Sequence, residues 1–170
     1  GRGAFRRRFG IPVKATAYAC LQTIFKVDPR FDSVAKRILE ADSDAVIVLK
    51  ELPMTNQVGQ LVRARMRKEL SEAQLARVFF LPPLSDQDYA DAYGAVDVLL
   101  DSFPFGGHTT TMDAFSAGCP VVTLPTDLMS GRCTLGFLRF LGLEKELVAA
   151  TIEDYVAIAL RVGGDPALRA

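Results

Sequence analysis

The residues with the clearest capacity for chemistry lie in one short run, Asp101-Ser-Phe-Pro-Phe-Gly-Gly-His-Thr-Thr-Thr-Met-Asp113. The run contains the only histidine of the chain, His108, directly after a glycine pair and directly before three threonines. Glycines let a backbone turn tightly and approach a ligand closely, and the free amides and dipole at a helix start attract anions. The sequence therefore predicts a phosphate site where a helix begins.

Single residues of this run have distinct expected roles. We expect the amides of 108–111 to face a phosphate, with the hydroxyls of Thr109 and Thr110 as further donors. Asp113 lies one helical turn after Thr109, where its carboxylate is placed to accept hydrogen bonds from sugar hydroxyls. The run is neither a Walker sequence nor a GxGxxG fingerprint, so the pattern predicts a nucleotide or sugar-phosphate site of undetermined class. The alternative is that the threonines only cap a helix and the glycines only turn the chain.

Along the chain, short apolar segments typical of strands alternate with segments whose apolar residues recur at helical spacing, and these elements must position the run. Strands are expected within 14–24 and at 45–49, 78–81, 96–100 and 121–124. Helices are expected from Pro29 to Ala41 and at 57–70, 86–94, 109–117, 131–141 and 151–163. This alternation predicts a doubly wound parallel α/β sheet in a single domain over residues 1–170. Ligands bind such sheets beyond the carboxyl ends of the strands, which is where the run 101–113 follows its strand.

Composition is that of an ordinary globular protein, with 49% hydrophobic and 24% charged residues. The 20 Lys and Arg residues balance the 20 Asp and Glu residues, so no net field favours nucleic acid or a membrane as a partner. We interpret the one basic cluster, Arg6-Arg7-Arg8, as a solvated chain end or helix face. Three widely spaced cysteines without a CxxC pair argue against zinc and disulfides, and they favour a reducing, cytoplasmic compartment.

Longer motifs resemble a known family. The run 101–113, followed by Ala117-Gly-Cys-Pro-Val-Val-Thr-Leu-Pro125, closely resembles the O-linked N-acetylglucosamine transferase family, including its bacterial and SPINDLY-type members. Tyr18-Ala-Cys-Leu-Gln-Thr-Ile-Phe-Lys-Val-Asp-Pro29 is similar to a segment of that family that ends near a phosphate-binding lysine. Phe80-Leu-Pro-Pro-Leu-Ser-Asp-Gln-Asp-Tyr89 is similar to its nucleobase loop, and Gly131-Arg132 and Gly142-Leu-Glu-Lys-Glu-Leu-Val-Ala149 continue the match.

The resemblance implies the C-terminal, Rossmann-like half of a GT-B glycosyltransferase, which is a UDP-sugar binding domain and a fragment of a longer chain. The implied reaction is inverting, needs no metal or other cofactor, and transfers N-acetylglucosamine from UDP-GlcNAc to Ser or Thr of a protein acceptor. The N-terminal half, tetratricopeptide repeats and acceptor-side catalytic base are expected outside these residues, so the isolated chain should transfer nothing. Two alternatives stay open: the same fold with GDP-fucose or UDP-glucose as donor, and a non-catalytic nucleotide-binding scaffold.

For the diphosphate, the resemblance implies that Lys26 is the catalytic contact. Either Gln22 or Thr23 would assist it, and the spacing does not decide between them. The phosphate at the helix start would be bound by His108, Thr109 and Thr110. Arg132 would either support the phosphate loop or pair with a carboxylate.

For the nucleoside, the resemblance implies that the backbone of Leu84 faces the uracil and that Asp113 holds the ribose. Tyr89 stands where the animal enzymes have a histidine near the base. Asp86 replaces a lysine that contacts the ribose in the family, so the sequence departs from the family at this contact. Thr126 stands where a glycine often follows Leu-Pro, which predicts a different local turn.

Overall fold

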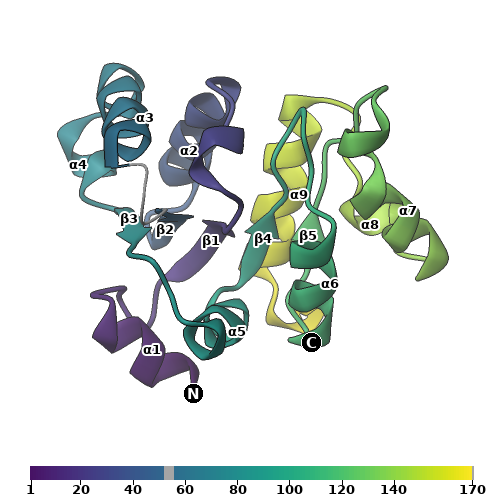
Figure 1. The fold of residues 1–170 in the computed structure, drawn as a ribbon, viewed down its shortest axis with the longest axis horizontal. Helices are drawn as coiled ribbons and strands as arrows, with labels where there is room; N and C mark the ends of the chain where they lie inside the picture. Colours follow the sequence, from purple (N-terminus) through teal and green to yellow (C-terminus); the bar gives the residue numbers. More distant parts are fainter. Residues whose placement is uncertain (52–55, 170) are drawn as a thin grey trace.

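A five-stranded parallel sheet with strand order β3-β2-β1-β4-β5 forms the centre of the structure (Figure 1). The structure is a computed structural model that describes residues 1–51 and 56–169. The strands are β1 (Thr16–Cys20), β2 (Ala45–Lys50), β3 (Val78–Leu81), β4 (Val98–Leu100) and β5 (Val121–Val122). The strand order reverses between β1 and β4, which places the ligand-binding crevice of such a sheet at their carboxyl ends. The predicted doubly wound parallel sheet is confirmed.

Helices cover both faces of the sheet (Figure 1). One face packs against α2 (Arg30–Ala41), α3 (Asn56–Glu69) and α9 (Ile152–Gly164). The other face packs against α1 (Arg2–Arg8), α5 (Asp86–Ala95) and α6 (Thr109–Ser116). The remaining α-helices are α4 (Glu72–Leu75), α7 (Cys133–Phe140) and α8 (Glu144–Leu147). Three short 3-10 helices are labelled η1 (Ile24–Lys26), η2 (Met129–Gly131) and η3 (Pro166–Arg169). In the described ranges, no helix has both the length and the apolarity to cross a bilayer.

The strand β2 shows why the apolar run at 45–49 folds as it does. Successive side chains of a strand point to opposite faces, and both faces of this sheet are covered. Ile47 and Leu49 pack in the core beneath α2 and α3, whereas Val46 and Val48 pack on the face of α1 and α5. A continuous apolar run therefore satisfies both cores at once, as the sequence predicted.

The expected elements differ from the observed ones mainly at their ends. The helix expected at 131–141 is observed as α7, which begins later, at Cys133, and the strand expected at 121–124 is shorter. Thr123 leaves the strand because it bridges to Val148 instead. Three short helices, α1, α4 and α8, were not predicted. Each is too short for an apolar period to be visible in the sequence, so their stability must come from tertiary contacts and caps.

The interpretation of the basic cluster as solvated is wrong for Arg6. Arg7 and Arg8 are exposed, but the side chain of Arg6 is 0% exposed. Its guanidinium donates to the backbone carbonyls of Ala95 at 2.7 Å and Ala15 at 2.6 Å, and it donates to the carboxylate of Asp97 at 2.7 Å. A guanidinium whose N–H donors find acceptors in this way is tolerated in a core. Only the tertiary fold distinguishes it from its two neighbours in the sequence.

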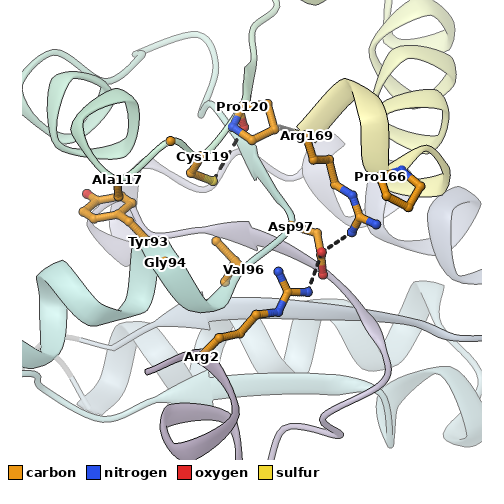
Figure 2. Close-up of a pocket in the computed structure, with 11 residues that line it drawn as sticks. Arg2, Tyr93, Gly94, Val96, Asp97, Ala117, Cys119, Pro120, Pro166 and Arg169 are labelled. Carbon is orange, nitrogen blue, oxygen red and sulfur yellow. Dashed lines mark hydrogen bonds and ion pairs between the residues drawn. The ribbon is translucent and has the colours of Figure 1, made fainter.

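Asp97, directly before β4, accepts hydrogen bonds from several arginine side chains at the amino edge of the sheet (Figure 2). Its carboxylate accepts from Arg2 at 2.5 Å, from Arg6, from Arg169 and from the amide of Ala17. Burial alone would raise the pKa of Asp97, but the amide and the guanidinium groups outweigh burial and hold that pKa below its usual range. One buried carboxylate thus fastens α1 and η3 to the central strands.

We expect Arg6→Ala to lower the free energy of unfolding by about 3–5 kcal/mol, because it removes one partner of a buried ion pair and leaves several carbonyls without a donor. The control is Arg8→Ala, which breaks an ion pair with Asp88 whose arginine side chain is 62% exposed. That control should cost about 1 kcal/mol or less. Urea unfolding of both variants measures the difference, and equal costs would contradict the structural role given to Arg6.

Candidate functional site

Two loops meet at the crevice between β1 and β4. The first runs from Leu21 into η1, and the second runs from Asp101 to the start of α6. They touch directly, because the side-chain amide of Gln22 donates to the hydroxyl of Thr110. A Cβ added to Gly107 would lie 2.5 Å from Nε2 of Gln22 and 2.7 Å from Oγ1 of Thr110. Glycine at 107 is therefore required for this close approach to Gln22 and Thr110, whereas the expected approach of the glycine pair to a ligand stays a prediction.

Asp101 holds the second loop in its turn. Its carboxylate accepts from the amide of Gly107 at 2.7 Å and from the hydroxyl of Thr123 at 2.8 Å. Its own carbonyl accepts from the phenol of Tyr155 at 2.7 Å. Burial raises the pKa of Asp101, and the hydrogen bonds from Gly107 and Thr123 oppose that rise. The loop is consequently fixed both to the residue that follows β5 and to α9.

The start of α6 presents backbone amides as predicted, with one correction. His108 is the N-cap, and in the part of the chain that the structure describes the amides of 108–110 have no acceptor. The amide of Thr111 is different, since it donates to the carbonyl of His108 at 3.1 Å. The hydroxyl of Thr111 is also buried and lies 2.9 Å from that of Thr134. Of the amides of 108–111 that were expected to face a phosphate, only those of 108–110 are therefore available as donors.

The side chains of the first turn are open to solvent. His108 and Thr109 are exposed and Thr110 is half-buried. The imidazole of His108 makes no capping hydrogen bond to its helix, and its ring lies 5.5 Å from the ring of Phe137 on α7. Histidine and threonine side chains so placed, next to amides without acceptors, are suited to donate to an anion.

Lys26, at the end of η1, reaches the same crevice. Its ammonium lies 3.4 Å from Oε1 of Gln22 and 4.2 Å from the ring centroid of Phe105. The amide of Gln22 thus contacts both Lys26 and Thr110 and links η1 to the start of α6. Thr23 instead stands before η1 and accepts the amide of Lys26 with its backbone carbonyl at 2.8 Å. Of the two residues that the sequence left open, Gln22 is the one whose side chain contacts Lys26.

Three of the residues expected at the nucleoside lie around one pocket of about 410 Å³. Asp86 and Tyr89 of α5 line it together with Asp113 of α6. The phenol of Tyr89 donates to the carbonyl of Leu21 at 2.8 Å, and burial raises the pKa of this phenol. Leu84 is not among the lining residues, since its half-buried side chain packs into the core beneath α5 and α6. The prediction for Leu84 concerned its backbone and stays a prediction.

Lys50 is a residue of this region that the sequence analysis missed. It ends β2, and its ammonium lies 4.2 Å from the ring centroid of Tyr89. Burial lowers the pKa of Lys50, and the charge of Lys26 contributes in the same direction. The available signal was its position directly after the apolar run 45–49, at the carboxyl end of the expected strand, where ligand-facing residues are common. Phe105 was missed as well, although it lies inside the run 101–113.

Among the described residues Arg132 forms no ion pair with a carboxylate, and its expected support of the phosphate loop stays a prediction. Its guanidinium donates to the backbone carbonyl of Thr126 at 3.1 Å. The hydroxyl of Thr126 donates to the carbonyl of Pro104 at 3.3 Å, so this residue ties the turn after β5 to the second loop. The different turn expected at Thr126 is not tested by these contacts.

Two Asp-x-Asp triplets occur in the chain, at residues 42–44 and 86–88. The carboxylate of Asp42 accepts the amide of Asp44 at 2.9 Å, and the carboxylate of Asp88 pairs with Arg8. Across residues 1–51 and 56–169, no three His, Cys, Asp or Glu side chains are grouped closely enough to hold a metal ion. Cys20, Cys119 and Cys133 are free thiols, the first two of them buried.

Comparisons with known proteins agree with this geometry. Residues 4–170 match the family model described as glycosyl transferase family 41. A Caenorhabditis elegans UDP-N-acetylglucosamine–peptide N-acetylglucosaminyltransferase is 30% identical over 94% of the chain, which spans 14% of that protein. A probable enzyme of the same description, SPINDLY, from Hordeum vulgare is 30% identical over 87% of the chain, which spans 16% of it. The chain thus covers only a small part of these relatives.

Among solved structures, the Thermobaculum terrenum O-GlcNAc transferase mutant K341M superposes with a TM-score of 0.81 at 29% identity, covering 91% of this chain and 30% of that one. A sucrose-phosphate synthase from Thermosynechococcus elongatus has a TM-score of 0.67 at 18% identity, with 96% of this chain and 40% of that one covered, and shows the fold alone. The sheet and its helices match halves of GT-B glycosyltransferases. Since the family match extends over nearly the whole sequence, the chain belongs to glycosyl transferase family 41.

Proposed function

We propose that this chain is the donor-binding half of an inverting, metal-independent glycosyltransferase that moves N-acetylglucosamine from UDP-GlcNAc to Ser or Thr of a protein. The observation that carries the proposal is the hydrogen-bonded connection from Lys26 through Gln22 to Thr110, beside amides that lack acceptors at the start of α6. This arrangement suits a diphosphate at the crevice between β1 and β4. Relatives described as UDP-N-acetylglucosamine–peptide N-acetylglucosaminyltransferases support the choice of donor.

The proposed mechanism stabilises the leaving group. As the bond between sugar and diphosphate breaks, negative charge grows on the departing UDP. Lys26, the amides of 108–110 and the hydroxyls of Thr109 and Thr110 meet that charge, and His108 donates beside them. Donors fixed in this way stabilise a transition state by about 3–4 kcal/mol each. The base that activates the acceptor hydroxyl is expected on the N-terminal half, outside these residues.

The nucleoside is proposed to occupy the pocket between α5 and α6. The carboxylates of Asp86 and Asp113 line that pocket and are acceptors for ribose hydroxyls, while Tyr89 forms its wall beside the base. The backbone of Leu84, directly before α5 and its cap Ser85, is expected to face the uracil. Partners of the complete protein are then a nucleotide sugar, a protein acceptor, the other GT-B half and tetratricopeptide repeats.

Another donor on the same fold is the second candidate. Asp86 and Tyr89 line the nucleoside pocket and depart from the family's lysine and histidine, which favours testing GDP-fucose and UDP-glucose beside UDP-GlcNAc. Competition of UDP against GDP in a thermal-shift titration discriminates between the bases. A non-catalytic nucleotide-binding scaffold is the remaining alternative. In that case Lys26→Ala would leave the function of the complete protein intact.

Lys26→Ala and His108→Ala should each weaken the affinity for UDP. Removing a charge-assisted contact to a diphosphate should cost Lys26→Ala about 10- to 100-fold in Kd, and the loss at His108 should be smaller. Isothermal titration of UDP into the chain and its variants measures both. Lys145→Ala, an exposed lysine on α8, is the control and should bind as the parent does. If His108→Ala binds UDP as tightly as the parent, the assignment of the phosphate site is wrong.

Gly107→Ala should disrupt the site from within. The new methyl group would collide with Gln22 and Thr110, so we expect both a lower UDP affinity and a loss of about 1–3 kcal/mol in unfolding free energy. The matched control is Gly136→Ala inside α7, where a Cβ meets nothing within 4 Å. That control should stabilise the chain by up to about 1 kcal/mol. Equal behaviour of the two variants would contradict the close packing described at Gly107.

The chain by itself should bind UDP and transfer no sugar, because it supplies leaving-group contacts but not the proposed acceptor-side base. A radiolabelled UDP-GlcNAc assay with a Ser- and Thr-rich acceptor peptide checks this. Robust turnover by these 170 residues alone would contradict the proposal that the acceptor-side base lies outside them.

A further inference from the structure

We propose that Phe105 is a positioning residue: its ring holds the ammonium of Lys26 where the donor diphosphate is bound. The inference rests on the proposed function, because it concerns the same crevice. Its starting observation is the distance of 4.2 Å between Nζ of Lys26 and the ring centroid of Phe105. A lysine ammonium within about 6 Å of an aromatic ring is attracted by the negative face of that ring.

Phe105 is not a core residue. It is 49% exposed, although its neighbour Phe103 is 2% exposed and packs against Tyr155. An exposed phenyl group gains little by burial, so packing does not account for its place above the crevice. Its ring does lie against the ammonium of Lys26.

The partners of Lys26 are neutral. In the ranges 1–51 and 56–169, its ammonium forms no ion pair with a carboxylate, and it contacts the amide oxygen of Gln22 and the ring of Phe105. A carboxylate at this place would compete with the diphosphate for the same charge. A ring and an amide oxygen restrict the flexible side chain without neutralising it, which lowers the ordering cost of binding.

Phe105 is itself held in place by its loop. The hydroxyl of Ser102 donates to the carbonyl of Phe105 at 2.7 Å. The next amide, that of Gly106, donates to the carbonyl of Ser130 in η2 at 2.9 Å. Both hydrogen bonds fix the peptide group that joins Phe105 to Gly106, so the ring is carried by a backbone that is held in place.

The test uses the complete protein and UDP as the probe. Phe105→Leu keeps an apolar side chain and removes the ring, so it should weaken UDP binding about two- to five-fold. Phe105→Tyr keeps the ring and should bind within about two-fold of the parent. The control is Phe140→Leu on α7, the same change at a residue that is 91% exposed, and it should leave binding unchanged.

A double-mutant cycle separates positioning from direct contact with the ligand. If the ring acts through the ammonium, Phe105→Leu has no further effect on UDP binding once Lys26→Ala is present. An equal loss in both backgrounds would mean that Phe105 touches UDP itself, and the proposal would be wrong. Full affinity of Phe105→Leu in the parent background would overturn it as well.

A second readout needs no ligand. After reductive ¹³C-dimethylation, which keeps the positive charge, the Lys26 methyl resonance should be shifted upfield by the ring current in the parent and in Phe105→Tyr. It should return to an ordinary position in Phe105→Leu, and no such change would refute the contact. If this contact is observed but the parent does not bind UDP, it is the proposed function that fails, and the role of Phe105 in donor binding fails with it.

Discussion

The site depends on one buried carboxylate, that of Asp101. An acidic side chain with 2% exposure is costly unless hydrogen bonds satisfy it, and the amide of Gly107 and the hydroxyl of Thr123 do so. These bonds oblige the chain to turn back toward β5 directly after β4. The turn places the backbone at Gly107 against Gln22 and starts α6 beside η1. The hydrogen bond from Gln22 to Thr110 and the contact between the hydroxyls of Thr111 and Thr134 then hold the start of α6 at the crevice.

The two ends of β4 show how the protein separates stability from binding. Asp97, at the amino end, takes three guanidinium groups and joins distant segments of the chain. Asp101, at the carboxyl end, takes only neutral donors. Lys26 and Lys50, near that same end, rest against aromatic rings. The three arginines at Asp97 are thus used in hydrogen-bonded contacts with its carboxylate, whereas Lys26 and Lys50 form no ion pair among the described residues and remain available for an anion.

The sequence predicted the sheet and the passage from a strand through the run 101–113 into a helix, because both follow from local patterns. The alternation of apolar and helical segments determines the layers of the fold. A glycine at position 107 indicates a close backbone approach, because it has no Cβ. Arg6 shows the limit of such reasoning, since three consecutive arginines look alike until the fold buries one of them. The link from Lys26 through Gln22 to Thr110 was also beyond local pattern, because it joins the ends of two strands that are neighbours only in the folded sheet.

The charges around the crevice also argue for one orientation of a bound nucleotide. Asp86 and Asp113 line the pocket between α5 and α6, and none of the described residues lining it is a lysine or arginine. A phosphate there would face two carboxylates, whereas ribose hydroxyls and base N–H groups would find acceptors. Around α6 the opposite holds, since its free amides, His108 and the nearby ammonium of Lys26 favour negative charge. For the donor complex that we propose, we therefore expect the nucleoside to lie toward α5 and the diphosphate toward η1, with the sugar beyond Lys26 at the open side of the crevice.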